Sequence, residues 1–185
     1  MGEEGMYATK FAETIDVKLN DQFLPFLYPN CYVNFNVDSD AVALGKELAA
    51  GKASDIEVIA AVYDYVVKNI TYDHERAENV KPDYVPVVDD VLKEKKGICF
   101  DYSSLMAAML RSQRIPTRLE FGYAGDAYHA WITTYIEDIG WINGIIEFDG
   151  ADWTLMDPTF AANMGTKKIK SFIGDGNNYT TKYIY

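Results

Sequence analysis

Cysteine is scarce in this chain. Only Cys31 and Cys99 occur among its 185 residues, and they lie far apart without any Cys-x-x-Cys spacing. The sequence therefore indicates neither a zinc site nor a redox pair. Acidic residues are plentiful, but none of them form the Asp-x-Asp-x-Asp-Gly loop of a calcium site. We expect no metal, no cofactor and no disulfide framework, although one bridge between the two cysteines is compatible with the sequence.

Long apolar runs are also absent. No stretch approaches the roughly 18–20 uninterrupted apolar residues that a membrane helix needs. The first six residues, MGEEGM, lack the basic-then-apolar pattern of a signal peptide. We therefore expect a chain that does not insert into a membrane.

Basic side chains are outnumbered. The chain has 17 Lys and Arg against 28 Asp and Glu, which gives a net charge of −11. Such a chain repels phosphate backbones, so nucleic acid is not an expected partner. Hydrophobic residues make up 49% of the chain and charged residues 24%, as in folded proteins. The length suits one compact domain.

The N-terminal part alternates apolar and polar residues in two places. Residues 15–19 place Ile15, Val17 and Leu19 on one face, and residues 33–37 repeat the pattern. These runs predict strands. We therefore expect a β extension over residues 1–38, packed on a catalytic domain that covers residues 39–185.

Helical patterns follow. A helix is predicted after Ser39 with a left-handed C-cap at Gly51, and a second from the capping box at 54–57 to about Asn69. Residues 71–97 read as a polar loop with at most a short helix over 88–93. After Cys99 an apolar stripe predicts a helix that ends before Pro116, and alternating runs beyond it predict an antiparallel sheet. Helices first and strands afterwards indicate the α+β class.

The predicted position of Cys99 at a helix N-terminus favours a reactive thiol. A cysteine attacks carbonyls as the thiolate, and the unpaired N–H groups at a helix N-terminus stabilise that anion. Gly97, two residues earlier, permits a tight approach of the loop to the helix. We interpret Cys99 as a nucleophile; the alternative is an inert buried cysteine.

Two further residues could complete a triad. His129 opens an alternating run after the glycine-containing loop 122–126, which could bring it near the head of the Cys99 helix. Asp157 ends another run before Pro158, and on an antiparallel neighbour of the His129 strand it could accept the ring N–H. The alternatives are a structural histidine and a turn aspartate. His74 is interpreted as part of a solvated loop.

Several sequence blocks resemble the transglutaminase-like superfamily in both order and spacing. They are residues 69–73 (NITYD), 96–105 (KGICFDYSSL), 110–111 (LR), 115–118 (IPTR), 122–123 (GY), 129–131 (HAW) and 153–160 (WTLMDPTF). The resemblance covers roughly residues 54 to 160. It implies a papain-like α+β core with Cys99, His129 and Asp157 as the catalytic triad.

The chain departs from the family pattern at two points. Arg114 stands where a helix-ending glycine is usual. No tryptophan precedes Cys99, although family transglutaminases use one there as a second oxyanion donor. Tyr63, Tyr65 or Tyr72 could offer a hydroxyl instead, and the backbone N–H of Cys99 is a natural first donor.

By this resemblance we expect a cysteine acyl-transfer enzyme that acts on amide bonds of peptides or proteins through a thioester. Water as acceptor makes it a protease or amidase. We slightly favour this outcome because small bacterial-looking members of the superfamily resemble hydrolases as often as cross-linkers. A lysine amine makes it a transglutaminase. The alternative function is a catalytically idle binding or cell-wall-associated module. The expected location is extracellular or in the cell envelope after removal of a leader, with the cytoplasm as alternative; the sequence leaves the oligomeric state open.

Overall fold

A computed structural model describes residue 11 and residues 13–137, 140–143, 145–148, 153–156 and 179–185. Its helices are η1 (Leu24–Phe26, a 3-10 turn), α1 (Asp40–Ala49), α2 (Asp55–Asn69), α3 (His74–Asn79), α4 (Val88–Glu94) and α5 (Cys99–Ser112). Its strands are β1 (Thr71–Tyr72), β2 (Lys96–Gly97), β3 (Thr117–Ala124), β4 (Ala127–Ile136), β5 (Gly140–Asn143), β6 (Ile145–Phe148), β7 (Trp153–Met156) and β8 (Tyr179–Ile184). This order confirms the predicted α+β class.

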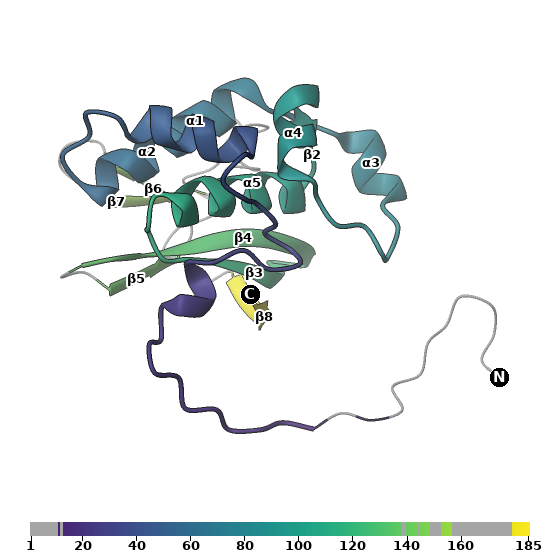
Figure 1. Cartoon of the computed structure of the whole chain (residues 1–185). Coiled ribbons are helices and arrows are strands. Elements are labelled where there is room, and N and C mark those ends of the chain that lie inside the picture. The colour runs from purple at the N-terminus through teal and green to yellow at the C-terminus, as the bar shows by residue number, and fades with distance from the viewer. Residues whose placement is uncertain (1–10, 12, 138–139, 144, 149–152, 157–178) are drawn as a thin grey trace.

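Helix α5 lies at the centre of the molecule (Figure 1). Helices α1, α2 and α4 cover one side of it, and the sheet with strand order β5-β4-β3-β8 lies on the other. The predicted apolar stripe is fully buried, with Leu105, Met106, Met109 and Leu110 each 0% exposed. A helix that packs against neighbours on both sides must be buried nearly all round, as α5 is. The helix that begins with Cys99 is therefore held between the other helices and the sheet.

Strands β3 and β4 form a tight hairpin. They pair antiparallel from Thr117 opposite Thr134 to Ala124 opposite Ala127. Only Gly125 and Asp126 remain for the turn, and Gly125 adopts a φ of 61° that favours glycine. The loop expected over residues 122–126 is thus mostly strand, because the alternating pattern of β3 continues to Ala124. His129 follows the turn on β4, opposite Gly122.

The two predicted N-terminal helices are confirmed. The Ser54 side chain accepts a hydrogen bond from the Glu57 backbone N–H at 3.4 Å, and α2 ends at Asn69 as expected. Gly51, just after α1, has a φ of 75°. The Glu57 carboxylate accepts from the Ala53 N–H at 2.9 Å, which satisfies another donor at the start of the helix.

Residues 71–97 hold more structure than expected. The predicted short helix is α4, but α3 occupies the stretch around His74 that we interpreted as loop. The Asp73 carboxylate caps α3 by accepting from the Arg76 N–H at 3.0 Å. Strands β1 and β2 pair in parallel on either side of α3 and α4 and bring Tyr72 opposite Gly97. This short ladder holds the residues just before Cys99 in place.

Arg111 fastens three distant parts of the chain. Its guanidinium is 1% exposed and donates to the carbonyls of Thr117 at 2.8 Å, Tyr28 at 3.0 Å and Tyr185 at 2.8 Å. Burial lowers the pKa of Arg111 to about 10, so the side chain remains charged at neutral pH. The three carbonyls satisfy that buried charge and join the N-terminal segment, β3 and the strand β8 region around α5.

The two strands predicted over residues 13–37 are wrong. The described part of residues 11–38 holds no strand, only η1 and turns. Ile15, Val17 and Leu19 are 71%, 65% and 50% exposed, and Figure 1 shows this segment running away from the body. A strand needs a backbone partner, and this segment has no neighbouring ladder here. Val33 is instead buried at 0% exposure. The division at residue 38 stays a prediction.

Candidate active site

A cavity of about 410 Å³ opens between the start of α5 and the sheet. Its walls come from the segment between α3 and α4, from the first turn of α5, from β3 and β4, and from residues 183–185. Both Cys99 and His129 line it. The structure therefore brings these two predicted site residues to one cavity although they are on different elements.

Cys99 is the first residue of α5, which confirms its predicted position at a helix N-terminus. Its side chain is partly exposed, and both Cys99 and Cys31 are free thiols, so no bridge joins them. Ile98 precedes it in an extended conformation and turns the chain into the helix. The unpaired N–H groups of the first turn thus lie beside the sulfur, where they favour a thiolate and later an oxyanion.

Gly97 and Asp101 fix this junction. The Asp101 carboxylate is 0% exposed and accepts from the Ile98 backbone N–H at 2.7 Å. A Cβ atom on Gly97 would stand 2.5 Å from the Asp101 Cβ. The expected tight approach of loop to helix at Gly97 is therefore present, and the residue it approaches is Asp101.

Two serine side chains connect α5 to other parts of the chain, and one of them bonds to the strand that carries His129. Ser103 lies one turn after Cys99 on the same face and donates to the Ala130 carbonyl at 3.0 Å. Ser104 donates to the Tyr32 carbonyl at 2.8 Å. Because Ala130 follows His129 directly, the first of these bonds sets the position of the histidine along α5. Sequence reasoning assigned no role to these serines, although their place one turn after the cysteine was a usable signal.

His129 is 6% exposed and its ring stacks on Trp131, with centroids 6.4 Å apart and an angle of 23° between the planes. Gly122 opposite it lacks a side chain for a clear reason. A Cβ there would lie 2.0 Å from the Thr180 carbonyl oxygen of β8 and 2.9 Å from the Trp131 ring. The glycine therefore lets β8 and the Trp131 ring pack closely against the strand pair beside His129.

Asp157 lies outside the described residues. The strand just before it, β7, pairs with β6, whereas the described partners of β4 are β3 and β5. Among the described strand pairs, the expected pairing of the Asp157 strand with the His129 strand is not present, and β7 instead forms a hairpin with β6. The role of Asp157 in the triad stays a prediction.

The three candidate tyrosines for a second oxyanion donor are placed differently. Tyr72 lines the cavity, with its ring centroid 4.9 Å from that of His74. Tyr63 is 5% exposed in the core between the helices, and neither it nor Tyr65 is among the residues that line the cavity. Of the three, Tyr72 is therefore the one positioned to reach a substrate. At the rim, burial and the neighbouring Tyr183 raise the pKa of Tyr128, so its hydroxyl stays protonated.

In the described part of the chain, no group of three or more His, Cys, Asp or Glu side chains could hold a metal ion. None of the described helices is long and apolar enough to cross a membrane.

Two bacterial proteins are similar to this chain in sequence. Uncharacterized protein YebA of Bacillus subtilis (strain 168) is 30% identical over an alignment 103 residues long, which covers 45% of this chain and 14% of YebA. Uncharacterized protein ML0607 of Mycobacterium leprae (strain TN) is 27% identical over an alignment 167 residues long, which covers 86% of this chain and 53% of that protein. The chain thus spans about half the length of ML0607 and much less of YebA.

Two solved structures share the fold. The periplasmic domain of TgpA from Pseudomonas aeruginosa superposes with a TM-score of 0.52 at 23% identity, over 75% of this chain and 50% of that one. A protein from Cytophaga hutchinsonii, provisionally named a cysteine protease, gives a TM-score of 0.52 at 19% identity, over 90% and 55%. The family model described as the transglutaminase-like superfamily matches residues 42–144, more than half of the chain. The chain therefore belongs to the transglutaminase-like superfamily, as its sequence blocks predicted.

Proposed function

We propose that the protein is a cysteine acyl-transfer enzyme that cleaves amide bonds in peptides or proteins. The observation that carries the proposal is the opening of Cys99 and His129 into one cavity, with Cys99 at the N-terminus of a buried helix. A nucleophile and a base within reach of one substrate carbonyl are the minimum that thioester chemistry needs.

In the proposed first step, the Cys99 thiolate attacks the substrate carbonyl carbon while His129 holds the proton taken from the thiol. The carbonyl π bond opens to an oxyanion, which the N–H groups at the start of α5 stabilise. Collapse of this intermediate breaks the C–N bond, and the His129 imidazolium gives its proton to the leaving amine. Asp157 would accept the other ring N–H and keep the tautomer that this transfer requires.

In the second step, an acceptor attacks the thioester carbonyl, His129 takes its proton, and the Cys99 sulfur leaves. We propose water as the acceptor, which makes the enzyme a protease or amidase. With a glutamine side-chain amide as donor, the first step would release ammonia; a lysine amine as acceptor would then form an isopeptide bond and make the protein a transglutaminase.

The lining of the cavity supports a peptide substrate with apolar side chains. Eight aromatic residues contribute: Tyr32, Tyr72, Tyr84, Phe100, Phe121, Tyr128, Tyr183 and Tyr185. Among the described residues that line it, none is acidic and Lys81 is the sole Lys or Arg. Aromatic walls bind apolar side chains and leave hydroxyls free to orient the backbone of a peptide. We further propose a location outside the cytoplasm, in line with the periplasmic domain of TgpA.

Thiol labelling tests the proposal first. Cys31 is exposed and Cys99 only partly so, which means that access alone favours Cys31. Iodoacetamide at about pH 6 should nevertheless label Cys99 first, because a thiolate held by a helix N-terminus and a histidine reacts faster than an ordinary thiol. His129→Ala should remove this preference. Labelling of Cys99 no faster than Cys31 would instead fit an idle binding module.

Product analysis then identifies the reaction. A mixed peptide library is incubated with the wild type and with Cys99→Ala, each with and without an added primary amine. The products are identified from their masses by mass spectrometry. Cleaved peptides that depend on Cys99 support hydrolysis, and amine adducts support transamidation. The absence of both refutes the proposed function.

A further inference from the structure

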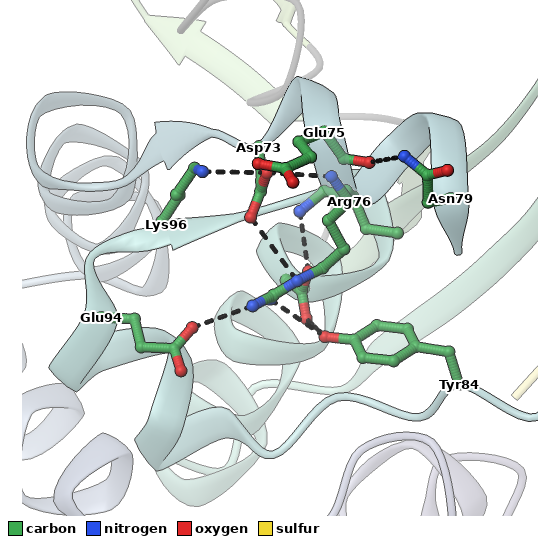
Figure 2. Close-up of polar contacts among 9 residues, drawn as sticks. Asp73, Glu75, Arg76, Asn79, Tyr84, Glu94 and Lys96 are labelled. Carbon is green, nitrogen blue, oxygen red and sulfur yellow. Dashed lines mark hydrogen bonds and ion pairs between the residues drawn. The ribbon is translucent and has the colours of Figure 1, made fainter. Parts of the chain in front are cut away.

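A polar cluster lies behind the cavity and has no part in the proposed reaction. Figure 2 shows Arg76 of α3 at its centre, between Glu94 at the end of α4 and Tyr84 of the segment that joins these helices. The Arg76 guanidinium donates to Glu94 at 2.9 Å and to the Tyr84 hydroxyl at 3.3 Å. One nitrogen also lies 3.6 Å from the buried Asp101 carboxylate. The cluster therefore ends at the first turn of the Cys99 helix.

Tyr84 links the cluster to the cavity. Its hydroxyl donates to the Asp101 carboxylate at 2.5 Å, and its ring lines the cavity edge-on to Phe100, with centroids 6.3 Å apart. Asp101 accepts from Tyr84 with one oxygen and from the Ile98 N–H with the other. The same carboxylate thus holds the residue before Cys99 and a residue of the opposite wall.

The protonation states suit this arrangement. Burial and the neighbouring Asp101 raise the pKa of Tyr84, so its hydroxyl remains a donor at neutral pH. Burial raises the pKa of Asp101, while the bonds from Tyr84 and Ile98 and the charge of Arg76 lower it. The contact is short and partly buried, and the Arg76 guanidinium lies 3.6 Å from the same carboxylate, so the hydrogen bond fixes the geometry firmly.

The wall that Tyr84 anchors has little regular structure of its own. Val80, Lys81 and Pro82 line the cavity next to it, in the segment between α3 and α4. Val80 is 42% exposed, and the Tyr84 N–H closes a single turn by donating to the Lys81 carbonyl at 3.1 Å. Such a segment holds a defined position only where its side chains are tied to a rigid element, and α5 is that element.

We propose that the Tyr84 hydroxyl is a positioning group that sets the distance between this wall and Cys99, and thereby the binding of the acyl donor. The inference rests on the proposed function, because it assumes that the cavity takes the substrate. Tyr84 contacts no reacting atom in this scheme. Its loss should weaken binding in the cavity while the thiol itself keeps its reactivity.

Tyr84→Phe and Tyr102→Phe form a matched pair for the test. Tyr102 is buried whereas Tyr84 is half-buried; it lies next to Asp101 in sequence, and its hydroxyl donates to the Ile70 carbonyl at 2.6 Å. It does not line the cavity. Each substitution removes one hydroxyl and the short hydrogen bond that it donates, and Tyr84→Phe also removes the longer bond from Arg76 at 3.3 Å. The loss of melting temperature should therefore be similar in the two variants or slightly larger in Tyr84→Phe.

Two reagents separate binding from thiol reactivity. Benzyloxycarbonyl-phenylalanyl chloromethyl ketone must occupy the cavity before it alkylates Cys99, so its inactivation saturates and gives KI and kinact. Iodoacetamide is small and alkylates the thiol without first binding to the cavity wall. For Tyr84→Phe we expect KI to rise about tenfold, with iodoacetamide rates within about threefold of the wild type. Tyr102→Phe should leave both unchanged.

Several results would overturn the inference. They are an unchanged KI in Tyr84→Phe, an equal rise of KI in Tyr102→Phe, inactivation of the wild type without saturation, and a Tyr84→Phe protein that is unfolded at room temperature. None of these measurements needs turnover. A wild type that cleaves no amide but shows the expected KI pattern would refute the proposed function and leave the role of Tyr84 supported.

Discussion

Replacing Gly97 by alanine should disturb the candidate active site, because the added Cβ atom would clash with Asp101. The new Cβ would stand 2.5 Å from the Asp101 Cβ and 3.1 Å from its Cγ, whereas ordinary van der Waals contact begins near 3.4 Å. Neither partner can move freely. The Gly97 carbonyl accepts from the Asp73 N–H at 2.9 Å, and Asp101 holds the Ile98 N–H from within the first turn of α5. Relief therefore requires a shift of roughly 1 Å at the junction next to Cys99.

The cost can be estimated from that shift. Overpacking a rigid site typically destabilises a protein by about 1–3 kcal/mol, and for a chain of this length each kcal/mol lowers the melting temperature by about 2–4 °C. A displacement of about 1 Å at a catalytic group can lower kcat/KM by about 10²-fold. We therefore expect Gly97→Ala to fold, to melt several degrees lower and to lose most of its activity.

Gly51→Ala is the matched control. Gly51 has a φ of 75°, and no atom lies within 4 Å of the point that an alanine Cβ would occupy, so alanine there costs backbone strain of about 1–2 kcal/mol without a clash. Differential scanning calorimetry and Cys99 alkylation by iodoacetamide are measured on both variants. Gly51→Ala should lose stability and keep the alkylation rate. A Gly97→Ala protein that melts and alkylates like the wild type would refute the steric reasoning.

Three further predictions concern the triad and the buried charges. Asp157→Asn should lower kcat by about 10²–10⁴ with an unchanged melting temperature; a wild-type rate would remove Asp157 from the triad. Arg111→Met should cost at least about 3 kcal/mol in urea unfolding, because three carbonyls lose a charged donor. The bond from the Arg76 N–H, and then Lys96 at 3.0 Å, lower the pKa of Asp73 from 3.8, so its stabilisation is present above pH 3.8 and lost as pH falls through the folded value. In Asp73→Asn, the free energy of unfolding measured by urea titration should therefore fall less steeply as the pH is lowered below about 5 than in the wild type. An unchanged pH dependence in this range would contradict the prediction.

The sequence predicted the elements whose signals are local. The capping box at Ser54 and the positive φ of Gly51 depend on a few adjacent residues, and both are present. The helix start at Cys99 follows from the apolar period of the residues after it. Arg114, which departs from the usual glycine, nevertheless has a φ of 67°. The turn after α5 therefore keeps its left-handed geometry with a residue that is strained there.

Other features depend on contacts between residues far apart in the sequence, which a local sequence pattern does not identify. The run Ile15, Val17 and Leu19 alternates like a strand, yet alternation specifies only which side chains share a face and not whether a backbone ladder is available. The bonds from Ser103 to Ala130 and from Tyr84 to Asp101 join residues 27 and 17 positions apart. No local spacing reveals such contacts, so the serine tie and the polar cluster emerged only with the fold.

Strand β8 has a consequence for the order of events during synthesis. Tyr183 pairs with Phe121 of β3, and both Tyr183 and Tyr185 line the cavity that holds Cys99. Translation delivers the helix and the histidine strand long before these tyrosines leave the ribosomal tunnel. The cavity therefore lacks this part of its wall until residues 179–185 have emerged. The cavity around Cys99 and His129 is thus complete only after β8 has paired with β3.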